Sequence, residues 1–192
     1  MSDLRIGIVG CAGTGKTTLA ATVAKKLKIP FLPSKNITQG ILDRDGYDYG
    51  SGIQIERFLA DSKRQLEIFE KTSESHNERD SFITDRTPVD LAAYALSELH
   101  DSDPALLRQI VESSRRLVSR YTHLFLCPWK DKPIENNKRR TLNPWYQYLI
   151  HGLELGLMAE WRVRYMILKH ESQERDVVFI VELITGKTLR LE

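Results

Sequence analysis

Residues 10–17 read G-C-A-G-T-G-K-T and match the pattern GxxxxGKT at all four of its fixed positions. Glycines let a backbone curl until several N–H groups point at one anion, beside the positive end of the helix that follows. In such a loop Lys16 reaches the β- and γ-phosphates of a nucleoside triphosphate, and the Thr17 hydroxyl is a ligand for magnesium. The remaining phosphate contacts are expected from Gly10, Ala12, Gly13, Thr14, Gly15 and Thr18.

The segments on either side of this loop support the same interpretation. Residues 4–9 form an apolar run that is typical of a buried strand. Leu19, Val23 and Leu27 follow at intervals of four, which predicts a helix over residues 16–28 with one apolar face. A strand, a glycine-rich turn and a helix in this order are the context that the motif requires.

A second group of chemically useful residues follows another short apolar segment, residues 82–85, which we expect to be a strand. Its last residue is Asp85, and Arg86 comes next. The carboxylate can hold magnesium through the water shell of the ion, and the guanidinium can form bidentate hydrogen bonds with an acceptor phosphate. ATPases that activate water often have Glu after this Asp, and no N-K-x-D guanine-reading motif occurs. The pair therefore favours a phosphotransferase over an ATPase or a nucleotide switch, although it also suits a structural ion pair at a helix start.

The third feature is a basic segment, residues 130–140, which contains five basic and two acidic residues between a predicted strand and a predicted helix. We expect a small basic lid over about residues 128–143 that closes over the phosphates, neutralises charge and excludes water. A solvated surface loop is the alternative, because runs of charge usually face solvent.

The remaining elements alternate between strands and helices. We expect a second strand at residues 29–33, a loop at 34–52 and a helix from 53 to about 79. Helices begin at Thr87-Pro88, Asp103-Pro104 and Asn143-Pro144, where a capping side chain precedes a proline, and they extend to about residues 99, 120 and 169. Strands at residues 122–127 and 177–183 complete the set.

This alternation predicts an α/β fold, the three-layer fold of P-loop proteins, with a mostly parallel sheet of about five strands and helices on both faces. We expect residues 1–192 to form a single domain, since 192 residues suit one core. Ligands of such sheets bind at the carboxyl ends of the strands.

Composition excludes several classes of protein. The net charge of +2 is too small to indicate nucleic acid by itself, and no apolar run is long enough to span a bilayer. The N-terminus lacks the layout of a signal peptide. Cys11 and Cys127 lack metal-type spacing and are expected to be reduced thiols. We expect a cytoplasmic protein, in the host cytoplasm if it is viral, and the sequence leaves a homodimer open.

Three segments carry a resemblance to a known family: G-C-A-G-T-G-K-T-T at residues 10–18, I-T-D-R-T-P-V-D-L-A-A-Y at residues 83–94, and the basic segment. Together they resemble the small P-loop nucleotide kinases, in particular the group that spans phage deoxynucleoside monophosphate kinases, thymidylate-kinase-like enzymes and the ribosylnicotinamide kinase domain. The likeness covers nearly the whole chain in element order. It implies that ATP and Mg2+ are bound through Lys16 and Thr17, and that Arg86 binds the acceptor phosphate. It also implies that Arg139 and Arg140 are the lid arginines.

The chain departs from this family pattern at one position. Members that phosphorylate a hydroxyl often have an acidic residue just after the second strand, whereas residues 33–36 read P-S-K-N. A hydroxyl must lose a proton during attack, but a monophosphate is already ionised and needs positive charge, which Lys35 can supply. The sequence therefore predicts transfer to a small-molecule acceptor, a nucleoside monophosphate and preferably a deoxynucleotide.

The acceptor is expected to bind between residues 34 and 64. The candidate contacts are aromatic rings for stacking, an amide for the edge of the base and guanidinium groups for the phosphate, supplied by Tyr47, Tyr49, Gln54, Arg57 and Arg64. A surface loop without function is the alternative for this stretch.

A kinase of this fold that phosphorylates a hydroxyl remains the main alternative. Its base would be Asp43, Asp45, Asp48 or Asp85, and its acceptor a nucleoside or a hydroxymethylated base within DNA. Nucleic acid is a partner only under this alternative, in which Trp129, Trp145 and the basic segment hold a strand.

Overall fold

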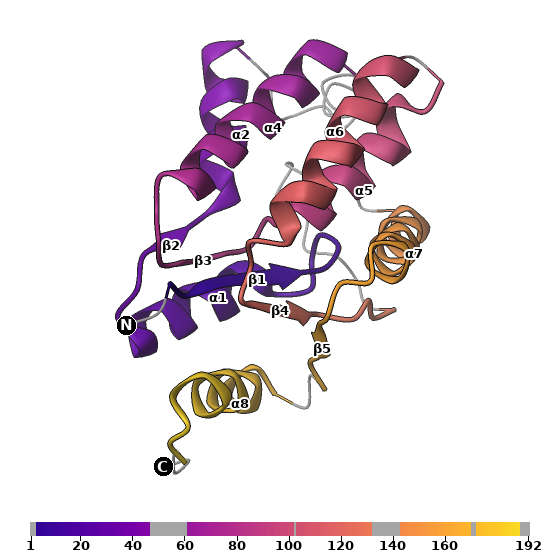
Figure 1. Ribbon diagram of the computed structural model, residues 1–192. Helices are drawn as coiled ribbons and strands as arrows, with labels where there is room; N and C mark the ends of the chain where they lie inside the picture. Colours follow the sequence, from indigo (N-terminus) through magenta and orange to yellow (C-terminus); the bar gives the residue numbers. More distant parts are fainter. Residues whose placement is uncertain (1–2, 47–60, 102, 132–142, 170–171, 189–192) are drawn as a thin grey trace.

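A computed structural model describes residues 3–46, 61–101, 103–131, 143–169 and 172–188. Within these residues the chain forms a five-stranded sheet between two layers of helices (Figure 1). The elements in chain order are β1 (Arg5–Val9), α1 (Lys16–Leu27), β2 (Phe31–Leu32), α2 (Ser34–Arg44), α4 (Ser62–Asn77), β3 (Phe82–Thr84), α5 (Pro88–Leu99), α6 (Pro104–Val118), β4 (His123–Leu126), α7 (Pro144–Glu160), β5 (Met166–Ile167) and α8 (Gln173–Thr185).

The strands follow the order β2-β3-β1-β4-β5, and every neighbouring pair is parallel. The central strand β1 pairs with β3 on one side and with β4 on the other, so the strand order reverses at β1. Ligands of open parallel sheets bind at such a switch point, outside the carboxyl ends of the strands. Residues 10–17 follow β1 directly and therefore lie at this point. The predicted α/β class, the parallel sheet and the helices on both faces are confirmed.

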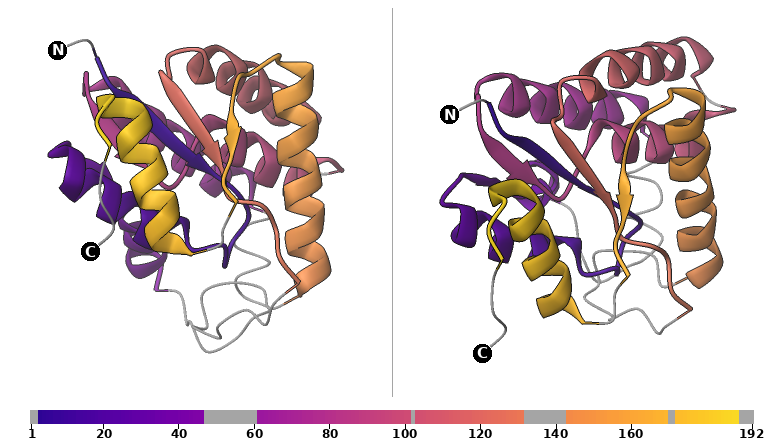
Figure 2. Two further views of the ribbon diagram at one scale, coloured as in Figure 1. Left: turned by 90° about the horizontal axis from the view of Figure 1, so that it is seen from below. Right: turned by 60° about the horizontal axis from the view of Figure 1, so that its bottom comes forward.

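Alternate residues of β1 face the two helical layers. Ile6 and Ile8 are fully buried in a core cluster with α1 and α8, whereas Val9 belongs to a second cluster with α5, α6 and α7. Figure 2 shows α8 and α7 on opposite sides of the sheet. A third cluster joins α2, α4, α5 and α6, which lie together in Figure 1 on the side of the sheet opposite α1 and α8.

A glycine in β1 lets α5 approach the sheet closely. A Cβ on Gly7 would lie 2.6 Å from the Leu124 side chain and 2.7 Å from that of Thr87. Because Thr87 caps α5, any larger residue at position 7 would push the start of that helix away from β1. This contact keeps the segment that contains Asp85 and Arg86 close to the residues that follow β1.

The three predicted helix starts are confirmed. Thr87 forms a capping box with Asp90, and the Asp103 and Asn143 side chains accept hydrogen bonds from Leu106 N–H and Trp145 N–H. Each of these three caps is followed by proline at the first helical position, where a missing N–H costs nothing.

The prediction of a loop at residues 34–52 is wrong for residues 34–44, which form α2. This helix buries Ile41 and Leu42 in the third cluster, against α4 and α5. Its N-terminal residue, Ser34, donates its N–H to the carboxylate of Asp85 at 2.8 Å. The cap thus comes from a residue 51 positions away, so the local sequence lacks the usual signal for a helix start.

Two predictions near the C-terminus are also wrong. The helix predicted for residues 144–169 ends at Glu160, and Arg162 adopts a left-handed backbone conformation with a φ of 56°. The chain then forms β5, which pairs with β4 and is the fifth strand. The apolar run at residues 177–183 lies within α8, where Val177, Ile180 and Val181 are buried at helical spacing.

The helix predicted for residues 53–79 is confirmed as α4 over Ser62–Asn77, with Asp61 as its N-cap, and residues 53–60 lie outside the described residues. No helix in the described part of the chain is long and apolar enough to cross a membrane.

One buried histidine makes stability depend on pH. His76 is 2% exposed, stacks on Phe82 at 5.1 Å between ring centroids, and forms a 2.8 Å hydrogen bond through Nδ1 with the Tyr121 hydroxyl. Burial, together with the smaller effect of the positive charge of Arg5, lowers the pKa of His76 to about 4.

We predict that the free energy of unfolding falls as the pH drops from about 6.5 to about 4, by about 3 kcal/mol, because the unfolded chain binds a proton that native His76 does not. The variant His76→Phe should lack this part of the pH dependence, and urea unfolding at several pH values measures it. His100→Gln is the control, since His100 is exposed and should leave the wild-type profile unchanged. Equal pH dependence in the His76→Phe variant and the wild type would contradict the prediction.

Candidate active site

The loop after β1 has the curled backbone that its glycines predict. Gly10, Gly13 and Gly15 have φ values of 147°, 87° and 87°, in the region that favours glycine. At Gly10 there is also no room for a side chain, since a Cβ would lie 2.6 Å from the carbonyl oxygen of Cys127. The loop therefore packs closely against the residue that follows β4.

Three side chains from three different helices hold the loop backbone. On α5, Asp90 Oδ1 accepts the Gly10 N–H at 3.3 Å, and on α7 the side-chain oxygen of Gln147 accepts the Ala12 N–H at 2.9 Å. On α8, Gln173 Nε2 donates to the Gly15 carbonyl at 3.2 Å. The sequence gave no signal for these three contacts, because they join residues 80 to 158 positions apart.

The predicted phosphate-binding lysine lies against the same loop. Lys16 Nζ donates to the carbonyl oxygens of Gly10 and Cys11, the latter at 2.8 Å. Within the loop, the Thr14 hydroxyl donates to the Cys11 carbonyl at 3.0 Å. The ammonium group therefore lies beside the loop N–H groups that face an anion in this motif.

The two residues predicted for the metal site are in direct contact. The Thr17 hydroxyl, in the first turn of α1, donates to Asp85 Oδ2 at 2.5 Å. Asp85 is 3% exposed, and its other oxygen accepts the Ser34 N–H at the start of α2. A hydroxyl and a carboxylate are hard oxygen ligands of the type that magnesium prefers, so these residues fit the ion. The described residues contain no group of three or more His, Cys, Asp or Glu side chains that could hold a metal by themselves.

The arginine after Asp85 is held against an aromatic ring. The guanidinium carbon of Arg86 lies 4.7 Å from the centroid of the Tyr94 ring, in a cation–π contact. Tyr94 is on α5, two turns after the capping box, so the helix that positions Asp90 also positions the ring that supports Arg86. A stacked guanidinium keeps its N–H edge available for a phosphate.

Two buried carboxyl groups lie near Lys16 on the α5 and α7 side of the loop. Burial raises the pKa of Asp90, and the charges of Lys16 and Arg86 oppose that shift. Burial also raises the pKa of Glu154 to about 7, and the nearby His151 partly opposes this. Glu154 is fully buried, and neither of its carboxyl oxygens has a hydrogen-bond partner in the described part of the chain.

The two cysteines are unpaired and buried, and burial raises the pKa of each thiol to about 12. Cys11 lies within the loop, and Cys127 lies next to Gly10. Thiols this far from ionisation are poor nucleophiles, so they act here as packing groups.

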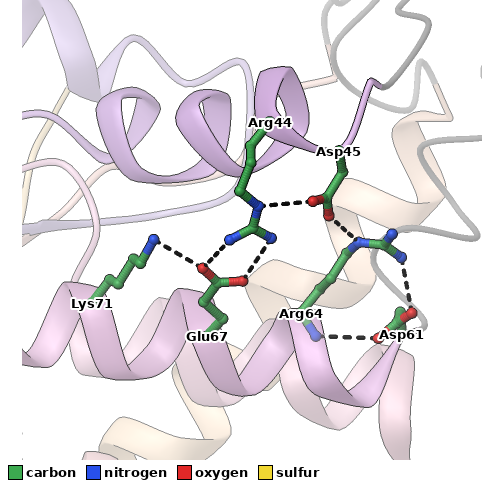
Figure 3. Close-up of polar contacts among 6 residues, drawn as sticks. All are labelled: Arg44, Asp45, Asp61, Arg64, Glu67 and Lys71. Atoms are coloured by element: carbon green, nitrogen blue, oxygen red, sulfur yellow. Dashed lines mark hydrogen bonds and ion pairs between the residues drawn. The ribbon is translucent and has the colours of Figure 1, made fainter.

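Of the residues predicted to bind the acceptor, Lys35 is exposed in the first turn of α2. Arg64 is held in ion pairs with Asp45 and Asp61, each at 2.8 Å, which link the end of α2 to the start of α4 (Figure 3). The same network continues through Arg44, Glu67 and Lys71. Hydrogen bonds from the arginines lower the pKa of Asp45 to about 2, and those from Arg44 and Lys71 do the same for Glu67.

The structure thus brings the predicted loop, Lys16, Thr17, Asp85 and Arg86 to one end of the sheet. The prediction of phosphate contacts from the Gly10 and Ala12 N–H groups is wrong, because Asp90 and Gln147 already accept these two groups. Thr18 is exposed in the first turn of α1. The other predicted contacts lie outside the described residues, and they are Tyr47, Tyr49, Gln54, Arg57, Arg139 and Arg140.

A strand, a phosphate loop and a helix at the switch point of a parallel sheet define a P-loop nucleotide-binding protein. A family model described as an AAA domain, AAA_28, matches residues 5–175, and the chain belongs to this family. No curated protein sequence matches the chain.

Solved structures show the same fold. A NadR protein in complex with NR superposes with a TM-score of 0.72 at 15% identity, covering 100% of this chain and 53% of that one, so this chain spans about half the length of NadR. A deoxyadenosine kinase from M. mycoides gives 0.64 at 14% identity, and a thymidylate kinase from Ehrlichia chaffeensis gives 0.61 at 14% identity. In both cases the match covers 96% of this chain and 100% of the kinase. The fold is that of the P-loop nucleoside and nucleotide kinases, as the sequence resemblance implied.

The buried carboxyl on α7 leads to a second prediction about pH. The pKa of Glu154 is about 7 in the folded protein and about 4.5 in the unfolded chain, so the unfolded chain loses this proton at a lower pH. The free energy of unfolding therefore falls as the pH rises from 4.5 to 7. The variant Glu154→Gln cannot ionise. Between pH 4.5 and pH 8, its free energy of unfolding should gain about 3 kcal/mol relative to that of the wild type.

Urea unfolding of both proteins across this range measures the difference. The control is Glu160→Gln at the exposed end of α7, which should follow the wild type at every pH. A constant difference between Glu154→Gln and the wild type would show that Glu154 does not titrate in this range.

Proposed function

We propose that the protein is a magnesium-dependent phosphotransferase that moves the γ-phosphate of ATP to a nucleoside monophosphate, preferably a deoxynucleotide. The observation that carries this proposal is the Asp85-Arg86 pair beside the phosphate loop, with Arg86 stacked on Tyr94 at 4.7 Å. One residue suits the metal and the next presents a guanidinium to a second phosphate.

The start of α2 supports an ionised acceptor. Its first N–H donates to Asp85, and the exposed Lys35 lies in the same turn, so the positive end of the helix dipole and a positively charged residue lie at the start of α2 beside Asp85. Both oxygens of Asp85 already accept hydrogen bonds, from Thr17 and Ser34. Asp85 is therefore a poor candidate for the base that a hydroxyl acceptor requires.

In the proposed reaction an oxygen of the acceptor phosphate attacks the γ-phosphorus in line. The new O–P bond forms as the bond to the β–γ bridging oxygen breaks, and ADP leaves with that oxygen. Lys16 and the loop N–H groups hold the donor, and Arg86 holds the acceptor, with Arg139 and Arg140 proposed to close over both. Magnesium, held by Thr17 and Asp85, would neutralise the charge of the β- and γ-phosphates. Catalysis then comes from positioning and charge neutralisation.

A kinase that phosphorylates a hydroxyl is the second candidate. Two observations favour it: the similar structures include a deoxyadenosine kinase and a NadR protein with NR bound. For a hydroxymethylated base in DNA, the exposed Trp145 is the supporting feature, since it packs edge-on against Tyr148, which in turn contacts Trp129.

We further propose that the enzyme acts in the cytoplasm, where unpaired thiols such as Cys11 and Cys127 stay reduced.

A coupled assay of ADP formation tests the acceptor. With ATP and Mg2+ present, we expect turnover to require a nucleoside monophosphate and to be highest with a deoxynucleotide. Activity on nucleosides alone, or on hydroxymethyluracil-containing DNA with strong salt dependence, would establish the second candidate instead. ATP turnover that no acceptor changes would identify an ATPase and contradict both.

Two substitutions test the assigned roles. Arg86→Ala should raise the KM for the acceptor at least tenfold while changing the KM for ATP by less than about threefold, because one charged hydrogen-bonding group is removed from the acceptor alone. Lys16→Ala is the comparison: it should abolish turnover yet unfold cooperatively in urea, since Lys16 contacts phosphates and is not a packed core residue. Equal loss of affinity for both substrates in Arg86→Ala would contradict the proposal that Arg86 binds the acceptor phosphate.

A further inference from the structure

The backbone of the phosphate loop has a polar partner on α7 that the proposed chemistry does not use. The side-chain oxygen of Gln147 accepts the Ala12 N–H at 2.9 Å across 135 positions of sequence. Gln147 is 2% exposed, whereas Tyr148, the next residue, is 54% exposed. The amide therefore points inward from the first turns of α7, and its position is fixed by the packing of the helix.

The helix offers this side chain a rigid base. Asn143 caps α7 through Trp145 N–H, and Pro144 begins the helix, so Gln147 lies on the first, capped turn. Ile150 follows on the same buried face and has no exposed surface. A side chain on a packed helix holds its partner more precisely than one on a loop.

The loop needs such a partner because its glycines do not fix its shape. Three residues with positive φ are entropically costly to order, and each can adopt other conformations before a nucleotide binds. Asp90 holds the Gly10 N–H and Gln147 holds the Ala12 N–H. These two contacts restrain the first half of the loop and leave the N–H groups from Gly13 onward for the phosphates.

The choice of an amide is consistent with the ligand. A carboxylate at this position would also accept the Ala12 N–H, but it would add a negative charge beside a bound triphosphate. Glutamine supplies the acceptor without the charge.

We propose that Gln147 is a positioning residue for the triphosphate, which holds the loop in its binding shape before ATP arrives. The proposal deepens the proposed function, on whose triphosphate site it rests. Loss of the Gln147 side chain should therefore weaken the binding of ATP, and this loss of affinity should be larger than any loss of fold stability explains.

The test is calorimetric titration with Mg2+ and the non-hydrolysable analogue AMP-PNP, without an acceptor. We expect Gln147→Leu to bind AMP-PNP about tenfold more weakly than the wild type, as for one lost hydrogen bond that ordered the site. The matched control is Leu157→Ala, which removes a buried side chain from the same helix ten residues beyond Gln147 and leaves the hydrogen bond to Ala12 in place. This control should unfold at a lower urea concentration but bind AMP-PNP as the wild type does.

Wild-type affinity in Gln147→Leu, or an equal loss of affinity in Leu157→Ala, would overturn the proposal. Because no phosphoryl group is transferred in this titration, either result is independent of the acceptor screen. A failure of the proposed function would appear only in that screen.

A second measurement does not require the leucine variant to fold. In the nucleotide-free wild type, the Ala12 amide should be protected from hydrogen exchange, and it should stay protected in Gln147→Glu, which keeps an oxygen acceptor. Gln147→Glu should bind AMP-PNP more weakly than the wild type does. This difference should be larger at low salt, because salt screens the repulsion between the added carboxylate and the triphosphate. An unprotected Ala12 amide in the wild type would contradict the proposal.

Discussion

The carboxylate of Asp85 joins three elements that meet at the carboxyl end of the sheet. One oxygen accepts the Thr17 hydroxyl at the start of α1, and the other accepts the Ser34 N–H at the start of α2. A buried carboxylate is stable only when hydrogen bonds replace its water, so this group requires both helices to begin where they do. The phosphate loop and α1 are thereby fixed relative to α2 and Arg86, where the acceptor is proposed to bind.

The phosphate loop depends on the rest of the fold in a comparable way. Its backbone is held by Asp90, Gln147 and Gln173, which lie on three helices from both faces of the sheet. The loop is therefore a part of the core on one side and a ligand surface on the other. Burial raises the pKa of Asp90 and of Glu154, and the positive charge of Lys16 opposes both shifts.

The junction of α2 and α4, where the acceptor is proposed to bind, is instead lined by exposed charges. Six residues at the end of α2 and along α4 form a continuous network of ion pairs (Figure 3). Exposed ion pairs of this kind contribute little to stability, and they weaken as salt increases. Beneath them, the apolar contacts of Ile41, Leu42, Ile68 and Phe69 hold the two helices together. Arg64 takes part in this network, and its proposed contact with an acceptor phosphate would have to compete with Asp45 and Asp61.

The sequence by itself determined the features that arise from neighbouring residues. The glycines, Lys16 and Thr17 stand within eight positions of one another, and the caps at Thr87, Asp103 and Asn143 lie within three residues of their partners. Tertiary structure decided the rest. Residues 34–44 become helical because Asp85 caps them and α4 covers them, and residues 177–183 are helical because their buried face packs on α1. The contact between Gln147 and Ala12 joins side chain and backbone across 135 residues, a distance at which no local pattern carries information.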